Sequence, residues 1–216
     1  MPMETEAPIA HQFDDARQQR HAAALGMWLF LATEVLFFGA LFLSYTLFRV
    51  NHPQALREAS RHTLLLAGTI NTAVLIGSSF TMVLAVRAAE LRQRAMAARL
   101  LFTTAGLGLV FLVIKGLEYR QEITEGLWPG SHFHMEGGDA VHARMFFYLY
   151  FLMTGVHAVH VTIGIVILLV FGMRVRRAPS VTPLATAIDL LGLYWHFVDM
   201  IWVFLFPLIY LVDRHS

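Results

Sequence analysis

The chain contains five apolar stretches that are each long enough to cross a lipid bilayer as a helix. A hydrocarbon core of about 30 Å takes roughly 20 apolar residues in helical form. Of the 216 residues, 57% are hydrophobic and only 14% are charged, a balance that water-soluble domains seldom approach. We therefore predict an all-α, polytopic membrane protein, a bundle of five transmembrane helices. The predicted spans are approximately residues 24–48, 63–86, 98–118, 144–172 and 189–212.

The parts outside the spans are short, so we predict one membrane domain, residues 24–212, between an N-terminal tail, residues 1–23, and a C-terminus, residues 213–216. Five spans place the tail and the second and fourth loops on one side, which holds nine arginines against six on the other. Basic residues near the membrane mark the cytoplasmic side, which predicts a cytoplasmic N-terminus and an external C-terminus. The nine are Arg17, Arg20, Arg87, Arg92, Arg94, Arg99, Arg174, Arg176 and Arg177, and the six are Arg49, Arg57, Arg61, Arg120, Arg144 and Arg214.

The chain has no cysteine, which excludes disulfides, cysteine-ligated zinc, iron–sulfur clusters and thiol catalysis. The residues that could carry chemistry are therefore the ionisable residues inside the spans. Glu34 lies near the middle of the first span, where an ionised carboxylate costs about 3 kcal/mol on insertion scales. We expect it to be protonated, paired or beside a hydrated gap. Either it handles protons or forms an inter-helix hydrogen bond tied to a partner, or it is a neutral residue that donates one structural hydrogen bond.

His157 and His160 lie three residues apart in the fourth span and therefore share a helical face. Two imidazoles at this spacing could share a metal ion, but zinc or iron needs further ligands. Only Glu34, His196 and Asp199 could supply them, and only if three helices converged at one depth. We favour the alternative, in which the histidines hydrogen-bond to Glu34 or to the backbone of another helix.

The last span, "YWHFVDMIWVFLFPLIYLV", contains His196 and Asp199 three residues apart. At this spacing they can face the same neighbour and reduce each other's cost by pairing. We favour a polar pair that fixes the fifth helix against its neighbours over a direct role in chemistry. Trp195 and Trp202 flank the pair, and we expect one of them to mark the headgroup level.

Four further residues are expected at the membrane surface. Lys115 and Glu118 end the third span one turn apart, where both can reach the interface. Arg92 and Arg94 belong to a basic connection that suits anionic headgroups. The external loop "HFHMEGGDAVH" is expected to be a solvated polar loop, with metal binding as the alternative. Its ionisable residues are His132, His134, Glu136, Asp139 and His142.

Taken together, five motifs resemble subunit III of the haem–copper cytochrome c oxidases. "LATEVLFFGALFLSY" resembles the family helix with an intramembrane glutamate followed by paired Phe, and "NTAVLIGSSFTMVLA" resembles its Asn-Thr and Ser-Ser stretch. "FLVIKGLEYR" resembles its Glu-Tyr helix end. "FFYLYFLMTGVHAVHVTIGIVIL" resembles its Thr-Gly-x-His-x-x-His-Val helix, and "YWHFVDMIWVFLFPLIYL" its terminal Trp-His-Phe-Val-Asp helix. Each motif alone is weak, but five in the right order over roughly residues 24–212 are highly specific.

The resemblance implies a non-catalytic helical subunit without redox centres. It would pack beside catalytic subunit I, which carries haem and copper, and copper-bearing subunit II, in a bacterial inner membrane. The oxidase as a whole would oxidise cytochrome c, reduce oxygen to water and pump protons. Members of the family are associated with structural support, bound phospholipid and sustained proton uptake. The family's polar positions carry over to Glu34, His157, His160, His196 and Asp199.

The chain departs from the long family form, which has seven spans, because it matches only the last five. The long form holds lipids in a cleft between its first two helices and the other five, so lipid binding here would need a wall from a neighbouring subunit. "HARMFF" also departs from the more usual Ser-Thr before the Phe pair. Five-span forms also occur beside nitric oxide reductases, which gives one alternative partner. A membrane metal enzyme is a second alternative. A larger respiratory supercomplex stays open, and no nucleic-acid partner is expected.

Overall fold

The computed structural model describes residues 11–54, 64–130 and 140–211, and within these ranges it consists of helices and short connections. Five helices are long and apolar enough to cross a membrane, which confirms the predicted fold class. A short 3-10 turn, η1 (Thr182–Leu184), leads into the last helix, and a π-helical turn, η2 (Pro207–Leu211), follows it. The long helices are α1 (Ala16–Asn51), α3 (Leu65–Glu90), α4 (Arg94–Thr124), α5 (Ala140–Arg177) and α6 (Ala185–Phe206).

The helices extend beyond the apolar stretches that predicted them. α1 begins eight residues earlier because the Asp15 side chain caps it, accepting a 2.6 Å hydrogen bond from the backbone N–H of Gln18. α4 and α5 likewise continue into residues 119–143, which were expected to be a loop. Hydropathy detects only the part of a helix that suits lipid, and polar residues can continue the same helix in water. At the other end of the chain, Pro207 lacks a backbone N–H, and the regular α-helix gives way to the wider η2 turn.

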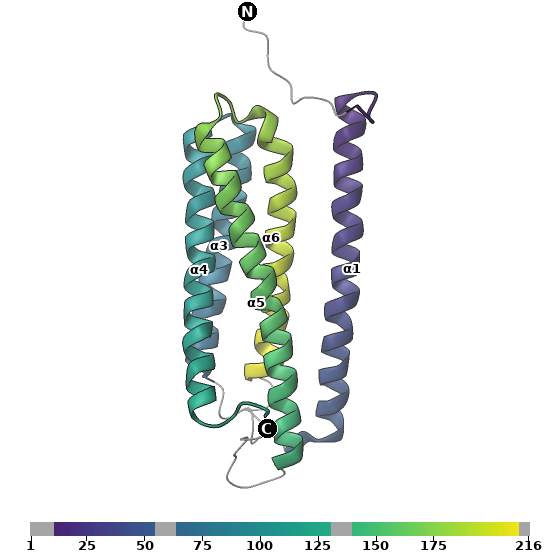
Figure 1. The fold of residues 1–216 in the computed structure, drawn as a ribbon, viewed down its shortest axis with the longest axis vertical. Helices are drawn as coiled ribbons and strands as arrows, with labels where there is room; N and C mark the ends of the chain where they lie inside the picture. Colours follow the sequence, from purple (N-terminus) through teal and green to yellow (C-terminus); the bar gives the residue numbers. More distant parts are fainter. Residues whose placement is uncertain (1–10, 55–63, 131–139, 212–216) are drawn as a thin grey trace, which may run out of the picture.

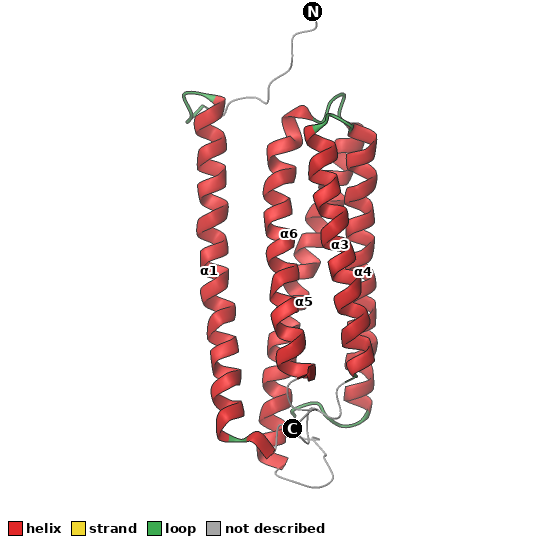
Figure 2. Cartoon of the chain, turned by 180° about the vertical axis from the view of Figure 1, so that it is seen from behind, coloured by secondary structure: helices red, strands yellow, loops and turns green. Residues whose placement is uncertain are grey.

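α3, α4, α5 and α6 form a four-helix bundle, and α1 stands beside it next to α5 and α6 (Figure 1). The view from behind shows the same separation (Figure 2). Only 11% of the residues in the most apolar part of α1 are buried, against 50% in that of residues Thr182–Leu211. α1 is therefore peripheral.

The contact of α1 with the bundle follows one narrow stripe. Between Met27 and Phe48, most of its buried and partly buried residues recur at alternating intervals of three and four, the spacing of a coiled-coil seam, and Phe42 is an addition beside this row. Glu34 falls within this stripe and is therefore turned toward protein. The Tyr45 hydroxyl extends the contact by donating a 3.1 Å hydrogen bond to the carbonyl of Leu208. The apolar and aromatic members of the stripe are Met27, Leu31, Phe38, Leu41, Tyr45 and Phe48.

Trp195 lies at the centre of the four-helix bundle. Its ring fits against Gly108 of α4 and Gly164 of α5, where a Cβ atom would lie 2.7 Å and 2.8 Å from the indole. Its Nε1 donates a 3.1 Å hydrogen bond to Ser78 Oγ of α3. A single side chain from α6 thus contacts the three other helices of the bundle.

The expectation that Trp195 or Trp202 marks the headgroup level is wrong, because both side chains are fully buried. Trp202 donates a 3.0 Å hydrogen bond to Thr72 Oγ1 and packs edge-on against Phe111. The aromatic-belt rule applies to rings on the lipid-facing surface. Here small and hydroxylated residues on the facing helices make room for the indoles inside the protein.

Candidate functional site

Glu34 of α1 and His160 of α5 meet across the seam between the two helices. Glu34 Oε2 lies 3.1 Å from His160 Nε2, and the two side chains are 17% and 16% exposed. This is ion-pair distance, although the angles fall outside those of a well-aligned hydrogen bond. The other ring nitrogen, Nδ1, lies 2.9 Å from the carbonyl of Val156, so it carries a proton. One further proton can therefore reside either on the carboxyl group or on Nε2 of the imidazole.

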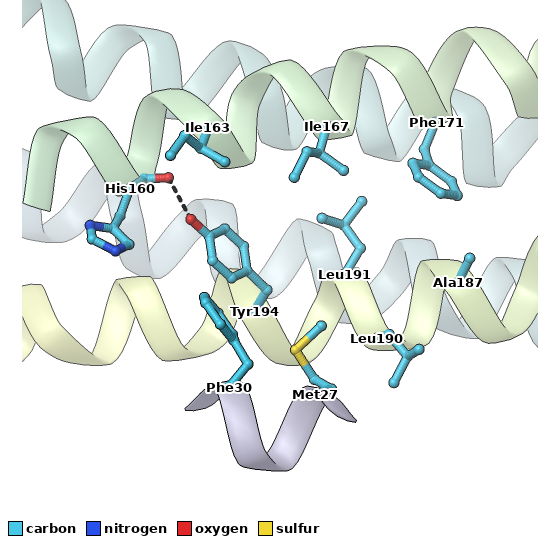
Figure 3. A pocket seen from close by; sticks show the side chains of 10 residues that line it. All are labelled: Met27, Phe30, His160, Ile163, Ile167, Phe171, Ala187, Leu190, Leu191 and Tyr194. Atoms are coloured by element: carbon cyan, nitrogen blue, oxygen red, sulfur yellow. Dashed lines mark hydrogen bonds between the residues drawn. The ribbon is translucent and has the colours of Figure 1, made fainter. Parts of the chain in front are cut away.

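An apolar cleft of about 470 Å³ opens beside this pair, between α1, α5 and α6. Figure 3 shows Met27 and Phe30 of α1 closing one side of it, with His160 at one end. The Tyr194 hydroxyl donates a 2.9 Å hydrogen bond to the His160 carbonyl, so its oxygen is already engaged. The rest of the lining is aliphatic or aromatic: Ile163, Ile167, Phe171, Ala187, Leu190 and Leu191.

His157 does not share the partner of His160. Its ring is fully buried, 5.5 Å from the Phe111 ring and 5.4 Å from the Trp202 ring. Neither ring nitrogen has a hydrogen-bond partner among the described residues. The expected contact with another helix therefore forms at His160, at ion-pair distance from Glu34, but not at His157.

His196 and Asp199 are both turned toward α3. His196 Nδ1 lies 2.7 Å from Ser79 Oγ, which ties α6 to α3. Asp199 is 6% exposed and lies beside the hydroxyls of Ser78 and Ser79, although neither contact meets the angles and distance of a hydrogen bond. The expectation that the histidine and the aspartate pair with each other is wrong, because each faces the serine pair instead.

Lys115 and Glu118 are not at the interface, and that expectation is also wrong. Their side chains are 3% and 0% exposed and form an ion pair of 3.1 Å inside the protein. Lys115 Nζ also donates to the hydroxyls of Tyr150 and Tyr210, at 2.7 Å each. Both hydroxyls in turn donate to Glu118 Oε1, at 3.1 Å and 2.6 Å. The ammonium group has no need to reach the headgroups, because the protein supplies all three acceptors.

This four-residue network joins α4, α5 and η2. The two tyrosines, inside otherwise apolar spans, were the sequence signal that could have revealed it, since a buried hydroxyl usually has a partner. The Lys115 ammonium also lies 4.5 Å from the Tyr150 ring centroid, a cation–π distance. Glu122, one turn further along α4, is buried as well.

Arg92 lies in the exposed turn between α3 and α4, and Arg94 is the exposed first residue of α4. Arg94 Nη1 donates a 2.5 Å hydrogen bond to the carbonyl of Ala178, which joins this turn to the one after α5. Their contact with lipid headgroups stays a prediction. Of the ionisable residues in "HFHMEGGDAVH", His142 stacks on His52 with ring centroids 3.7 Å apart. The remaining members, His132, His134, Glu136 and Asp139, lie outside the described residues.

The ionisable residues singled out in the spans lie in separate surroundings. Glu34 and His160 meet on α1 and α5, His157 lies among aromatic rings, and His196 and Asp199 face α3. Within the described ranges, no three histidine or acidic side chains are grouped as metal ligands would be. The convergence that a metal enzyme would need is not present among these five residues.

Five helices that are long and apolar enough to cross a bilayer, joined by buried polar contacts, define a multi-pass membrane protein. The family model of cytochrome c oxidase subunit III matches residues 5–213. "Cytochrome c oxidase subunit 3" of Thermostichus vulcanus is 33% identical, over 93% of this chain and 92% of that protein. The protein of the same name in Corynebacterium diphtheriae is 32% identical, over 93% and 96%. "Cytochrome bo(3) ubiquinol oxidase subunit 3" of Pseudomonas aeruginosa is 26% identical, over 94% and 91%.

The chain therefore belongs to the cytochrome c oxidase subunit III family, as its motifs predicted. The function of a subunit III in a haem–copper oxidase complex follows from this membership. Subunit III of these oxidases is a family without a redox centre.

Proposed function

We propose that this chain packs beside a haem- and copper-bearing catalytic subunit I and a copper-bearing subunit II in a bacterial inner membrane, with its N-terminus in the cytoplasm. The bacterial relatives support the location, and the nine-to-six distribution of arginines supports the orientation. Relatives are named for both cytochrome c and ubiquinol, so the donor of electrons to the complex is cytochrome c or a quinol. Gentle purification followed by identification of the copurifying subunits and haems tests this proposal and distinguishes it from a nitric oxide reductase partner.

Within that complex, the proposed contribution of this chain is to stabilise the catalytic subunit and sustain its proton uptake. The observation that carries the proposal is the contact of Glu34 with His160 at 3.1 Å, where one proton can move between two groups in an otherwise apolar region. Placing two ionisable groups inside a membrane costs free energy, so we expect such a pair to have a functional or structural role.

The Glu34→Ala oxidase is expected to keep its haems and its initial rate but to lose activity faster during turnover. The physical reason is that His160 loses the group with which it shares a proton. The measurement is oxygen consumption over many turnovers, normalised to haem content. Glu34→Gln is the matched control, because the amide keeps the contact with α5 but cannot ionise. Unchanged activity over many turnovers in both variants would remove the proton-support proposal, and a loss in the alanine variant alone would make the role structural.

A second contribution is favoured by the apolar cleft. We propose that it holds the acyl chain of a phospholipid, since its lining offers aliphatic and aromatic contacts. In the long family form the lipid cleft requires two additional helices. Here α1, α5 and α6 line a cleft of about 470 Å³ without them.

Filling the cleft with Ala187→Trp is expected to reduce the amount of phospholipid that copurifies with the complex. Ala187 lines the cleft, so an indole at this position occupies the space of the acyl chain. Ala40→Trp on the exposed surface of α1 is the control and should leave the lipid content unchanged. Lipid extraction and mass spectrometry of the washed complex provide the measurement. Equal lipid content in the two variants would contradict acyl-chain binding in this cleft.

A further inference from the structure

A second cavity, distinct from the apolar cleft, lies between α3 and α6. It is a groove of about 220 Å³ whose lining contains four ionisable side chains. The groove begins at three exposed charged residues, which are Arg87 and Glu90 of α3 and Asp189 of α6. His196 also lines it and lies seven positions after Asp189 along α6, a rise of about 10 Å. The groove therefore runs along α3 and α6 from the end of the bundle to the half-buried His196.

His196 connects the groove to a buried carboxyl group. Its Nδ1 lies 2.7 Å from Ser79 Oγ, and Ser79 lies beside Asp199. Both carboxyl oxygens of Asp199 are buried, without a well-formed hydrogen bond among the described residues. A carboxyl group in such surroundings is stable only if it binds a proton or is reached by water. The groove thus reaches the imidazole of His196, which contacts the hydroxyl of Ser79, and this hydroxyl lies beside the buried carboxyl group of Asp199.

We propose that the groove admits water and that a proton passes from it through His196 and Ser79 to Asp199, which makes Asp199 a proton-binding site of this subunit. His196 Nε2 accepts a proton from a hydronium ion in the groove, which leaves neutral water, and the ring releases the proton on Nδ1 to Ser79 Oγ. The hydroxyl proton of Ser79 passes at the same time to the carboxylate of Asp199. One proton enters and one is bound, so only N–H and O–H bonds change and no other reactant is required.

The charges that face this path are few. Arg87 and Glu90 form an ion pair of 2.8 Å on the α3 side of the groove entrance, and Asp189 adds a negative charge from α6. A net negative entrance favours the approach of protons over anions. Close to Asp199 itself, the groups that act from a neighbouring helix are the hydroxyls of Ser78 and Ser79. The site is independent of the contact between Glu34 and His160, and its test does not use oxidase activity.

The test is infrared difference spectroscopy of the complete oxidase complex in lipid nanodiscs on transfer from H₂O to D₂O. The carbonyl band of protonated Asp199 is assigned as the band that Asp199→Asn removes. In the unmodified complex this band should shift within the mixing time, because water reaches the site. His196→Phe should slow the shift severalfold, because it removes the proton carrier. Val83→Phe should slow it as well, because Val83 lines the groove and the larger ring obstructs it.

Two controls accompany these variants. Val113→Phe makes the same change at an exposed residue of α4 that does not line the groove, and should leave the exchange rate unchanged. Glu122→Gln should leave the Asp199 band in place. The proposal is overturned if Asp199→Asn removes no band. It is also overturned if the band exchanges in Val83→Phe as fast as in the unmodified complex. Val83→Phe changes no polar group, so it carries the test even where the His196 variant fails to assemble.

Discussion

Replacing Lys115 with alanine is expected to lower the free energy of unfolding of this subunit by about 3–5 kcal/mol, the cost of leaving one member of a buried ion pair without its partner. Lys115 is the only cation bonded to Glu118 in the described residues, and both tyrosine hydroxyls in the network are oriented around these two groups. The measurement is an SDS titration of the purified subunit in mixed micelles, followed by circular dichroism.

Two comparisons make this expectation specific. The double variant Lys115→Met with Glu118→Gln removes both charges and should recover most of the lost stability, because a neutral pair of similar volume avoids the desolvation cost. Arg87 and Glu90 have the same spacing on α3, but their side chains are 65% and 56% exposed. Arg87→Ala should therefore cost less than about 1 kcal/mol. Equal losses for the exposed and the buried pair would show that burial of Lys115 is not what makes it important.

Gly108→Ala is expected to destabilise the bundle by about 1–3 kcal/mol through overpacking. The new Cβ atom would lie 2.7 Å from the Trp195 ring, which is itself held by Gly164 and by its hydrogen bond to Ser78. Gly106→Ala, two residues away on the same helix, is the matched control because its Cβ would meet open space. That variant should be stabilised by up to about 1 kcal/mol, since alanine favours helix over glycine. The same titration measures both, and effects of the same sign would contradict the close approach at Gly108.

The number and order of the helices could be predicted from the sequence because length and hydropathy determine which segments suit lipid. Helix ends could not, since Asp15 and Pro207 act through capping and a missing N–H rather than through hydropathy. Hydropathy does not reveal the extensions of α4 and α5 for a related reason. Their polar ends are helical outside the apolar stretch that the prediction detects.

The candidate site was only partly predictable. Spacing correctly suggested that Glu34 could meet a histidine of the fourth span, and the contact forms at His160. Spacing cannot say which face of a nearly uniformly apolar helix turns toward protein. The sequence therefore predicts Lys115 at the interface, although two tyrosines distant in sequence give it partners inside the protein. The burial of Trp195 likewise depends on glycines of other helices, which no local pattern around the tryptophan reveals.

Because α1 contacts the bundle along a single stripe, the effect of a substitution on this helix should depend on whether the residue lies in the stripe or outside it. A substitution at Phe38 or Tyr45 disturbs attachment of the helix to its own subunit. A substitution at an outward residue such as Leu36 or Leu43 leaves that attachment intact and changes only the contact with the neighbouring lipid or subunit. A scan around the circumference of this one helix would thus distinguish loss of internal cohesion from loss of docking in the assembled oxidase.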